Sequence, residues 1–212
     1  MALIAGAGDA HAESIGRSVQ GRALEVRVTG ARDAALRVVV VGSIHGNETA
    51  GHAVIRRLRE MRAPGGMRVW TLRTVNPDGA AAGTRGNARG IDLNRNFPHR
   101  WRPGYHSGPR PLSEPESRAV RQLVRRVRPD LTIWYHQPLR QVDLSAGADP
   151  ALVRAYARRV GLPARRIGFL PGIATRWQNT YFPGTSAFVV ELARGRLSRA
   201  QAARHARAVL AV

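Results

Sequence analysis

The sequence predicts a single α/β domain: a mixed, mostly parallel sheet with helices on both faces. Short apolar runs rich in β-branched residues, such as residues 38–44 and 187–192, have the composition of buried strands. These runs alternate with amphipathic helical patterns, which is typical of parallel sheets covered by crossover helices. The chain has 212 residues without an internal repeat or an interdomain linker, a length that suits one domain.

The individual elements follow from the hydrophobic pattern and from residues that start and stop helices. In residues 48–62 apolar side chains recur on one helical face, and a Pro-Gly-Gly sequence follows. Ser113 and Glu116 have the spacing of a capping box, while Asp149 and Ser198 suit the N-cap position. The expected strands are residues 15–18, 23–28, 38–44, 68–75, 131–135 and 187–192. The expected helices are residues 48–62, 115–127, 150–160 and 199–210.

A long segment with little periodicity, residues 76–112, is rich in Gly, Asn, Arg and Pro. A loop of this length inside a compact domain is usually functional or disordered. The segment also carries large apolar and aromatic side chains, namely Ile91, Leu93, Phe97, Trp101 and Tyr105. We therefore expect it to form an ordered wall of a site.

The N-terminal residues resemble the end of a secretory signal peptide. Residues 2–12 are mostly small and apolar, and they end in Ala10-His11-Ala12, an A-x-A cleavage pattern. The basic n-region and most of the apolar h-region are missing. Residues 1–13 are therefore expected to be a leader or a truncated signal remnant, with residues 14–212 as the folded domain. The corresponding location is secreted or cell-envelope, with the cytoplasm as the alternative.

The chain is strongly basic, with a formal net charge of +20. One interpretation is an anionic partner such as a cell-wall polymer. The other is GC-rich coding, because all 34 basic residues are Arg and none is Lys. The arginines do not cluster with aromatic residues as on a nucleic-acid surface, so no nucleic-acid partner is expected. No apolar run is long enough to span a membrane.

Three residues are candidate metal ligands: His45, Glu48 and His136. His45 and Glu48 follow strand 38–44, at the edge where open α/β sheets bind ligands. His136 ends strand 131–135, so both imidazoles reach the same edge if the two strands are parallel. Imidazole and carboxylate suit zinc, and three protein ligands leave a position open for water, as in catalytic sites. The chain has no cysteine, which excludes disulfides and thiolate zinc sites.

Glu191 lies near the end of the last expected strand, after a run of apolar residues. A carboxylate there is costly unless it is paired or functional. It could take a proton from a water molecule activated by the metal.

At this point the chain resembles the M14 family of zinc carboxypeptidases, and within it the bacterial murein peptide amidases. The resembling parts, in the family's order, are His45-x-x-Glu48, Asn76-Pro77-Asp78-Gly79, Arg85, the D-L-N-R-N-F run at 92–97, His136 and Glu191. They cover roughly residues 38 to 192. The resemblance implies the zinc-carboxypeptidase fold for residues 14–212, one zinc per chain, and hydrolysis of a C-terminal amide in a peptide or murein peptide.

The resemblance also implies a role for each residue. His45, Glu48 and His136 would hold zinc, and Glu191 would be the general base that later protonates the leaving amine. Arg85 would polarise the scissile carbonyl. Asn94 and Arg95 would bind the terminal carboxylate of the substrate. Asp92 would accept the free N–H of His45 and fix its tautomer.

Several of these positions have simpler alternatives. Arg89 is close enough in sequence to take the place of Arg85, and Asp92 could be a local cap. His52 follows Glu48 by one helical turn and could compete as a ligand. The remaining histidines are expected at the surface: His11, His99, His106 and His205.

The segment before Glu191 departs from the pattern of larger carboxypeptidases, which carry a mobile-loop Tyr there. Residues 168–180 contain no Tyr, and Tyr181 is expected to pack in the core or at an edge. Polar residues in this segment predict a pocket for a polar leaving residue such as diaminopimelate; they are Thr175, Arg176, Gln178, Asn179 and Thr180. Arg176 is the candidate for the distal carboxylate, with a solvated surface position as its alternative.

Two other functions compete with a murein peptide amidase. Succinylglutamate desuccinylases and aspartoacylases share an H-G-N-E turn and a D-L-N-R run, and they act on N-acyl amino acids. A zinc-free binding module for anionic wall polymer is the second alternative. The Asn-Pro-Asp-Gly turn favours the murein type over the first, and the complete set of ligands with Glu191 disfavours the second.

Overall fold

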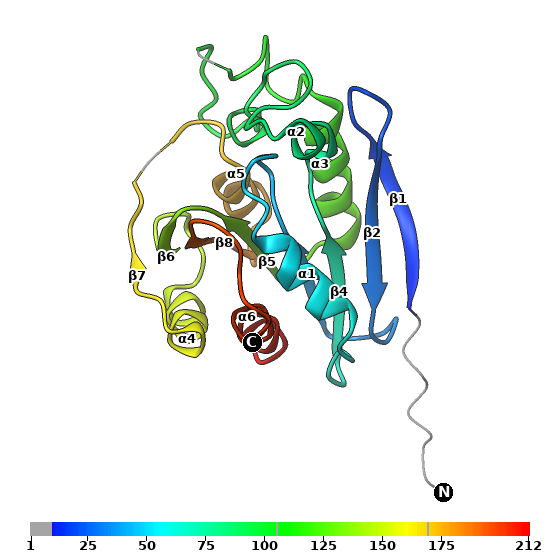
Figure 1. Ribbon diagram of the computed structural model, residues 1–212, viewed down its shortest axis with the longest axis vertical. Helices are drawn as coiled ribbons and strands as arrows, with labels where there is room; N and C mark the ends of the chain where they lie inside the picture. The colour runs from blue at the N-terminus through cyan, green and yellow to red at the C-terminus, as the bar shows by residue number, and fades with distance from the viewer. Residues whose placement is uncertain (1–9, 105, 169) are drawn as a thin grey trace, which may run out of the picture.

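The computed structural model describes residues 10–104, 106–168 and 170–212. Its strands form one sheet in the order β1-β2-β4-β3-β5-β8-β6-β7 (Figure 1). The strands are β1 (His11–Arg17), β2 (Ala23–Thr29), β3 (Leu36–Val41), β4 (Met67–Leu72), β5 (Leu131–His136), β6 (Leu139–Asp143), β7 (Ala164–Arg165) and β8 (Ser186–Ala193). The central strands β4, β3, β5 and β8 are parallel, while β2 and β6 join them antiparallel. The predicted mixed, mostly parallel sheet is confirmed.

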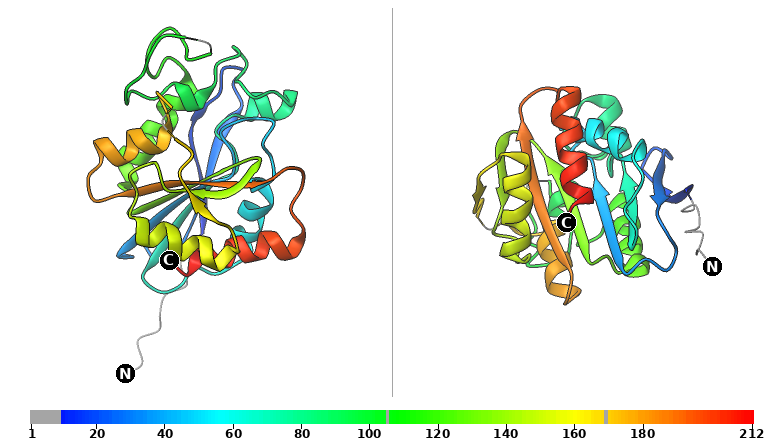
Figure 2. Two further views of the ribbon diagram at one scale, coloured as in Figure 1. Left: turned by 90° about the vertical axis from the view of Figure 1, so that its left-hand side faces the viewer. Right: turned by 90° about the horizontal axis from the view of Figure 1, so that it is seen from below.

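Helices cover both faces of this sheet, as predicted. They are α1 (Gly51–Arg59), α2 (Pro77–Ala82), α3 (Pro115–Val127), α4 (Pro150–Val160), α5 (Ala174–Tyr181) and α6 (Arg199–Leu210). Helices α1, α4 and α6 lie on one face, and α3 and α5 lie on the other (Figure 2). Val38 and Val40 of β3 pack in the first core, and Val39 and Val41 pack in the second. Because both faces are buried, the strand is a continuous apolar run.

The helix starts agree with two of the three expected caps. Asp149 accepts a hydrogen bond from the Ala151 amide at α4, and Ser198 forms a full capping box at α6. The capping box expected at α3 is wrong, because Glu114 occupies the N-cap position without a side-chain cap. Glu116 instead accepts from the Val19 amide at 3.0 Å, which ties α3 to the turn after β1. Because the Glu116 carboxylate is used in this tertiary contact, it does not form the local cap.

The first residues of β1 and α1 differ from those expected from the sequence. The N-terminal hairpin is confirmed, but β1 begins at His11, inside the leader expected at residues 1–13. Residues 1–9 of that leader lie outside the described residues. Helix α1 begins at Gly51 rather than at Glu48, because Glu48 lies in the turn that precedes it. No helix in the described parts of the chain is both long and apolar enough to cross a membrane.

The long segment 76–112 is folded over the carboxyl ends of the central strands, at the top of Figure 1. It contains α2 and a 3-10 turn, η1 (Leu93–Arg95). Leu93 and Phe97 are fully buried, and the Asn96 amide donates to the Ser107 carbonyl at 2.9 Å. The segment is therefore an ordered wall, as predicted, although Tyr105 lies outside the described residues.

Candidate metal centre and active site

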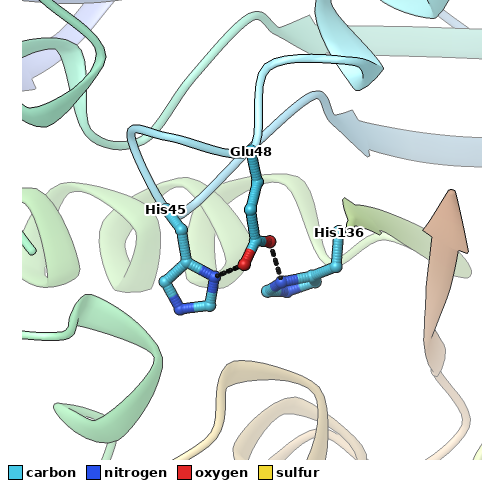
Figure 3. A group of neighbouring side chains, drawn as sticks. All are labelled: His45, Glu48 and His136. Atoms are coloured by element: carbon cyan, nitrogen blue, oxygen red, sulfur yellow. Dashed lines mark hydrogen bonds and ion pairs between the residues drawn. The ribbon is translucent and has the colours of Figure 1, made fainter. Parts of the chain in front are cut away.

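Three side chains meet at the carboxyl edge of the sheet: His45, Glu48 and His136 (Figure 3). His45 and Glu48 come from the turn between β3 and α1, and His136 is the last residue of β5. Because β3 and β5 are parallel neighbours, their ends lie side by side. One potential ligand atom from each residue lies within 4.8 Å of the others, and all three residues are buried. The predicted grouping of these residues is confirmed.

The Glu48 carboxylate lies between the two imidazoles. Its Oε1 is 3.0 Å from His45 Nδ1, and its Oε2 is 2.9 Å from His136 Nδ1. Burial acts to raise the pKa of Glu48, but the neighbouring imidazoles of His136 and His45 hold it well below its usual range. The group therefore presents an ionised carboxylate and two imidazoles to one point.

Asp92 fixes the orientation of His45. Its Oδ1 lies 2.9 Å from His45 Nε2, so in the neutral imidazole Nε2 carries the proton and Nδ1 carries the lone pair. That Nδ1 is buried and faces Glu48 Oε1 at 3.0 Å, on the side of the three-residue group. A buried nitrogen lone pair beside a carboxylate and a second imidazole is the donor set that zinc binds. The residues present therefore fit a zinc ion.

Arg85 contacts the same group from the long segment. Its Nη1 donates to Glu48 Oε1 at 2.9 Å, and its Nε donates to Asp92 Oδ2 at 3.1 Å. The side chain is 48% exposed, so it is open to a substrate. Arg89, the alternative for this position, instead lies 3.4 Å from Glu114.

The tight turns of the ligand segment explain two sequence features. A Cβ at Gly46 would lie 2.0 Å from the carbonyl carbon of Gly79, so only glycine fits. Asn76 accepts from the Gly79 amide and donates to the Gly86 carbonyl at 2.9 Å. The Asn76–Gly79 turn thus packs against the ligand turn and holds the backbone that carries Arg85.

Asn94 and Arg95 lie on η1, in the wall of the site. Asn94 Oδ1 accepts from the Ala174 amide at 3.0 Å, which joins η1 to the start of α5. That bond uses the oxygen of the carboxamide, and a substrate carboxylate would need its N–H donors. Arg95 is half-buried and donates to the Asn94 carbonyl at 2.7 Å.

Glu191 lies on β8 directly beside His136 in the parallel register. Side chains at paired positions of parallel strands point to the same face, so Glu191 accompanies His136. It is 9% exposed, and its Oε2 accepts from the Leu139 amide at 3.4 Å. Burial is the main cause that raises the pKa of Glu191, and the Glu48 charge raises it further, while His136 lowers it. Raising the pKa of a carboxylate makes it a stronger base, which suits a group that takes a proton from water.

The polar pocket expected before Glu191 is largely wrong. Gln178 is fully buried and donates to Thr132 Oγ1 at 2.8 Å, and Asn179 donates to the Ala146 carbonyl at 2.8 Å. These amides hold α5 against the sheet and are not available to a ligand. Arg176 is half-buried on α5, close enough for its charge to lower the pKa of His99. Tyr181 is 55% exposed at the end of α5, so its expected packing role is also wrong.

The other histidines take no part in the metal group. His52 Nε2 lies 2.9 Å from Ser43 Oγ, which removes it as a competing ligand. His205 is only 6% exposed, so its expected surface position is wrong. Its Nδ1 lies 2.9 Å from the Tyr156 hydroxyl, and this bond allows the imidazole to be buried in the core.

Gln137 is a residue at the site that the sequence pattern did not single out. It follows His136, and its backbone amide donates to Glu48 Oε2 at 3.2 Å. A polar residue between a strand-end histidine and Pro138 was the available signal, but its partners are distant in sequence.

The geometry agrees with comparisons with known proteins. Residues 8–138 match the zinc carboxypeptidase family. Murein peptide amidase A of Escherichia coli K12 is 31% identical over 122 residues, which are 50% of this chain and 50% of the relative. The enzyme of the same name from Vibrio campbellii is 30% identical over 145 residues, which are 60% of this chain and 57% of the relative. The alignments thus span about half the length of these curated relatives.

Solved structures give the same result over a larger share of the chain. Murein-tripeptide amidase MpaA from Escherichia coli O157 superposes with a TM-score of 0.79 at 26% identity, covering 97% of this chain and 92% of that one. Carboxypeptidase A from Helicoverpa armigera has a TM-score of 0.75 at 17% identity, covering 95% and 69%, which supports the fold alone. With the fold, the His-Glu-His group and the family match in agreement, the chain belongs to the zinc carboxypeptidase family.

Proposed function

We propose that this protein is a zinc-dependent metallocarboxypeptidase or amidase that hydrolyses a C-terminal amide bond. The observation that carries the proposal is the buried His45, Glu48 and His136 group with Glu191 beside it in the sheet register. Zinc held there supplies a Lewis acid that makes water nucleophilic near neutral pH. The Asp92 contact, which leaves His45 Nδ1 as the ligand atom, supports this assignment.

Glu191 and Arg85 would carry out proton transfer and charge stabilisation. Glu191 accepts a proton from the attacking water and returns it to the leaving amine. Its buried position beside His136 and its raised pKa suit a group that must act in both directions. Arg85 is held in place by its hydrogen bonds to Glu48 and Asp92. Its positive charge stabilises the carbonyl oxygen of the substrate as negative charge develops on that oxygen.

Binding of the terminal carboxylate falls to Asn94 and Arg95. The Ala174 contact orients the Asn94 amide, and the planar Arg95 guanidinium suits a carboxylate. A clamp at this position selects substrates whose leaving group is a terminal amino acid.

For the substrate we favour the amide between γ-D-glutamyl and diaminopimelate in a murein peptide. The support is the names of the relatives at 30% and 31% identity and of the structure at 26% identity. Arg176 is our candidate for the distal carboxylate of diaminopimelate, because it is the one basic residue of α5 and the Gln178 and Asn179 amides are engaged in other hydrogen bonds. The selectivity it adds should be small, about 5-fold or less, since a partly exposed ion pair contributes at most about 1 kcal/mol.

Association with anionic cell wall is a further part of the proposal, together with a secreted or cell-envelope location. The net charge of +20 supports it. A groove of about 450 Å³ between α1 and α6 is lined by Arg56, Arg57 and Arg199, together with Glu60, which pairs with Arg57 at 2.7 Å. Co-sedimentation with purified sacculi should weaken steeply between low and high salt, because screening removes exposed charge attraction. Salt-independent or absent sedimentation would remove this part of the proposal.

One assay tests the enzymatic proposal. Zinc-loaded protein is incubated separately with a murein tripeptide, an N-acyl amino acid and an L-peptide ending in phenylalanine, and new amines are measured. The expected result is fastest release of diaminopimelate, with E191Q as the inactive control. Faster release of phenylalanine would indicate an ordinary carboxypeptidase, and cleavage of the N-acyl amino acid alone would indicate a deacylase. No cleavage at all would favour a binding module.

A further inference from the structure

The Gln137 side chain joins two backbone segments beside the candidate metal centre. Its Oε1 accepts from the Ala50 amide at 3.0 Å. Its Nε2 donates to the Ala193 carbonyl at 2.7 Å and to the Gly195 carbonyl at 2.9 Å. One half-buried carboxamide therefore makes three hydrogen bonds to two segments that are far apart in sequence, one at Ala50 and one at residues 193–195.

Each of these contacts lies next to a residue of the site. Ala50 is the N-cap of α1 and follows Glu48 by two positions. Ala193 is the last residue of β8 and follows Glu191 by two positions. Gln137 itself directly follows His136. The side chain thus connects the turn that carries one ligand with the strand that carries the base.

The backbone of Gln137 adds a direct contact to a ligand. Its amide donates to Glu48 Oε2 at 3.2 Å, and the same oxygen lies 2.9 Å from His136 Nδ1. This amide can set the carboxylate orientation only while the backbone at Gln137 is held relative to the ligand turn. The three side-chain bonds provide that restraint.

We propose that Gln137 is a positioning residue that sets the orientation of Glu48 toward the metal, an inference that rests on the proposed zinc site. Partners that orient ligands typically contribute 10–100-fold to metal affinity. A purely structural role would instead lower the stability of the fold and leave zinc affinity unchanged.

The test compares substitutions of two carboxamide residues, Gln137 and Asn179, in the 212-residue chain. Q137L removes all three side-chain bonds at similar volume, and Q137N keeps the amide but is one methylene too short to span both segments. N179L is the matched control, because Asn179 also bonds three backbone groups, those of Ala146 and Ala187, away from the metal group. Zinc affinity is measured by competition with a chromophoric chelator, and the stability of the metal-free proteins by thermal unfolding.

We expect Q137L to weaken zinc binding roughly 10–100-fold and Q137N to weaken it less, while N179L loses stability but keeps wild-type affinity. If Q137L does not fold, the Q137N result decides. Equal zinc affinity in wild type and both Gln137 variants would overturn the inference and leave the proposed function intact. Failure of the wild type to bind zinc would overturn both.

Discussion

Histidines are buried at two places with opposite electrostatic surroundings: an edge cluster of His45, Glu48 and His136, and a core cluster of His205 with Tyr135 and Tyr156. At the sheet edge, burial acts to lower the pKa of His45, but Asp92 and Glu48 raise it above its ordinary value. In the core, His205 lies 2.9 Å from the Tyr156 hydroxyl and packs edge-to-face against the Tyr135 ring, and burial, with the charge of Arg204, lowers its pKa to about 4. Burial alone therefore does not mark a metal ligand. The neighbouring carboxylates distinguish the histidines that can hold a cation from the one that only packs.

The largest effect should come from the base at the edge cluster. E191Q keeps the size of the side chain but cannot accept a proton. Turnover should fall by roughly 10²–10⁴-fold, since that is the usual contribution of general base catalysis. Zinc content should stay at the wild-type value, because Glu191 is not one of the three grouped ligands. An active variant would place the base elsewhere.

The core cluster should contribute to acid sensitivity. The folded pKa of His205 is about 4 and lies below its ordinary value of 6.5, so protonation favours the unfolded chain. The stabilisation is fully present above pH 6.5 and is lost as pH falls toward 4. Integrated over that interval it amounts to about 3 kcal/mol.

The measurement is chemical unfolding of wild type and H205Q from pH 7 to pH 4 in the presence of a chelator. The chelator separates this effect from acid release of metal. H205Q should show a shallower loss of stability with falling pH. Parallel curves for the two proteins would contradict the assigned role of His205.

A smaller effect, on zinc affinity, is expected from Asp92, which acts on the metal through His45. D92N removes the charge that fixes the His45 tautomer but keeps a hydrogen-bond acceptor. Zinc affinity should fall roughly 10–100-fold. The control is D78N, since Asp78 bonds Ser18 and Arg22 at the hairpin and lies outside the metal group. Comparable zinc affinities for D92N and D78N would remove the distinction between the clusters.

The residues of the edge cluster were predictable from sequence because of where the parallel strands end. Strands β3, β5 and β8 are continuous apolar runs, so their positions followed from composition, and His45, Glu48, His136 and Glu191 followed from the strand ends. The parallel order of those strands then brought the four residues together. Local signals sufficed because the edge of a parallel sheet gathers strand-end residues by geometry.

Helix α5 was not predictable for the opposite reason. Gln178 and Asn179 have the polarity of pocket or surface residues, but their partners Thr132 and Ala146 are 46 and 33 positions away. His205 was misassigned in the same way, since the Tyr156 hydroxyl that satisfies it lies 49 positions away. Side chains whose role depends on a distant partner carry no local signal in a single sequence.

The zinc content of wild type, H136A and H205A after purification and exhaustive dialysis tests whether the edge cluster, and not the core cluster, holds the metal. The wild type should retain about one zinc per chain, H136A should lose it, and H205A should keep it. This result would show that the cluster with carboxylates holds the metal and the other does not. Full zinc occupancy in H136A, or loss of zinc in H205A with the fold intact, would contradict the account.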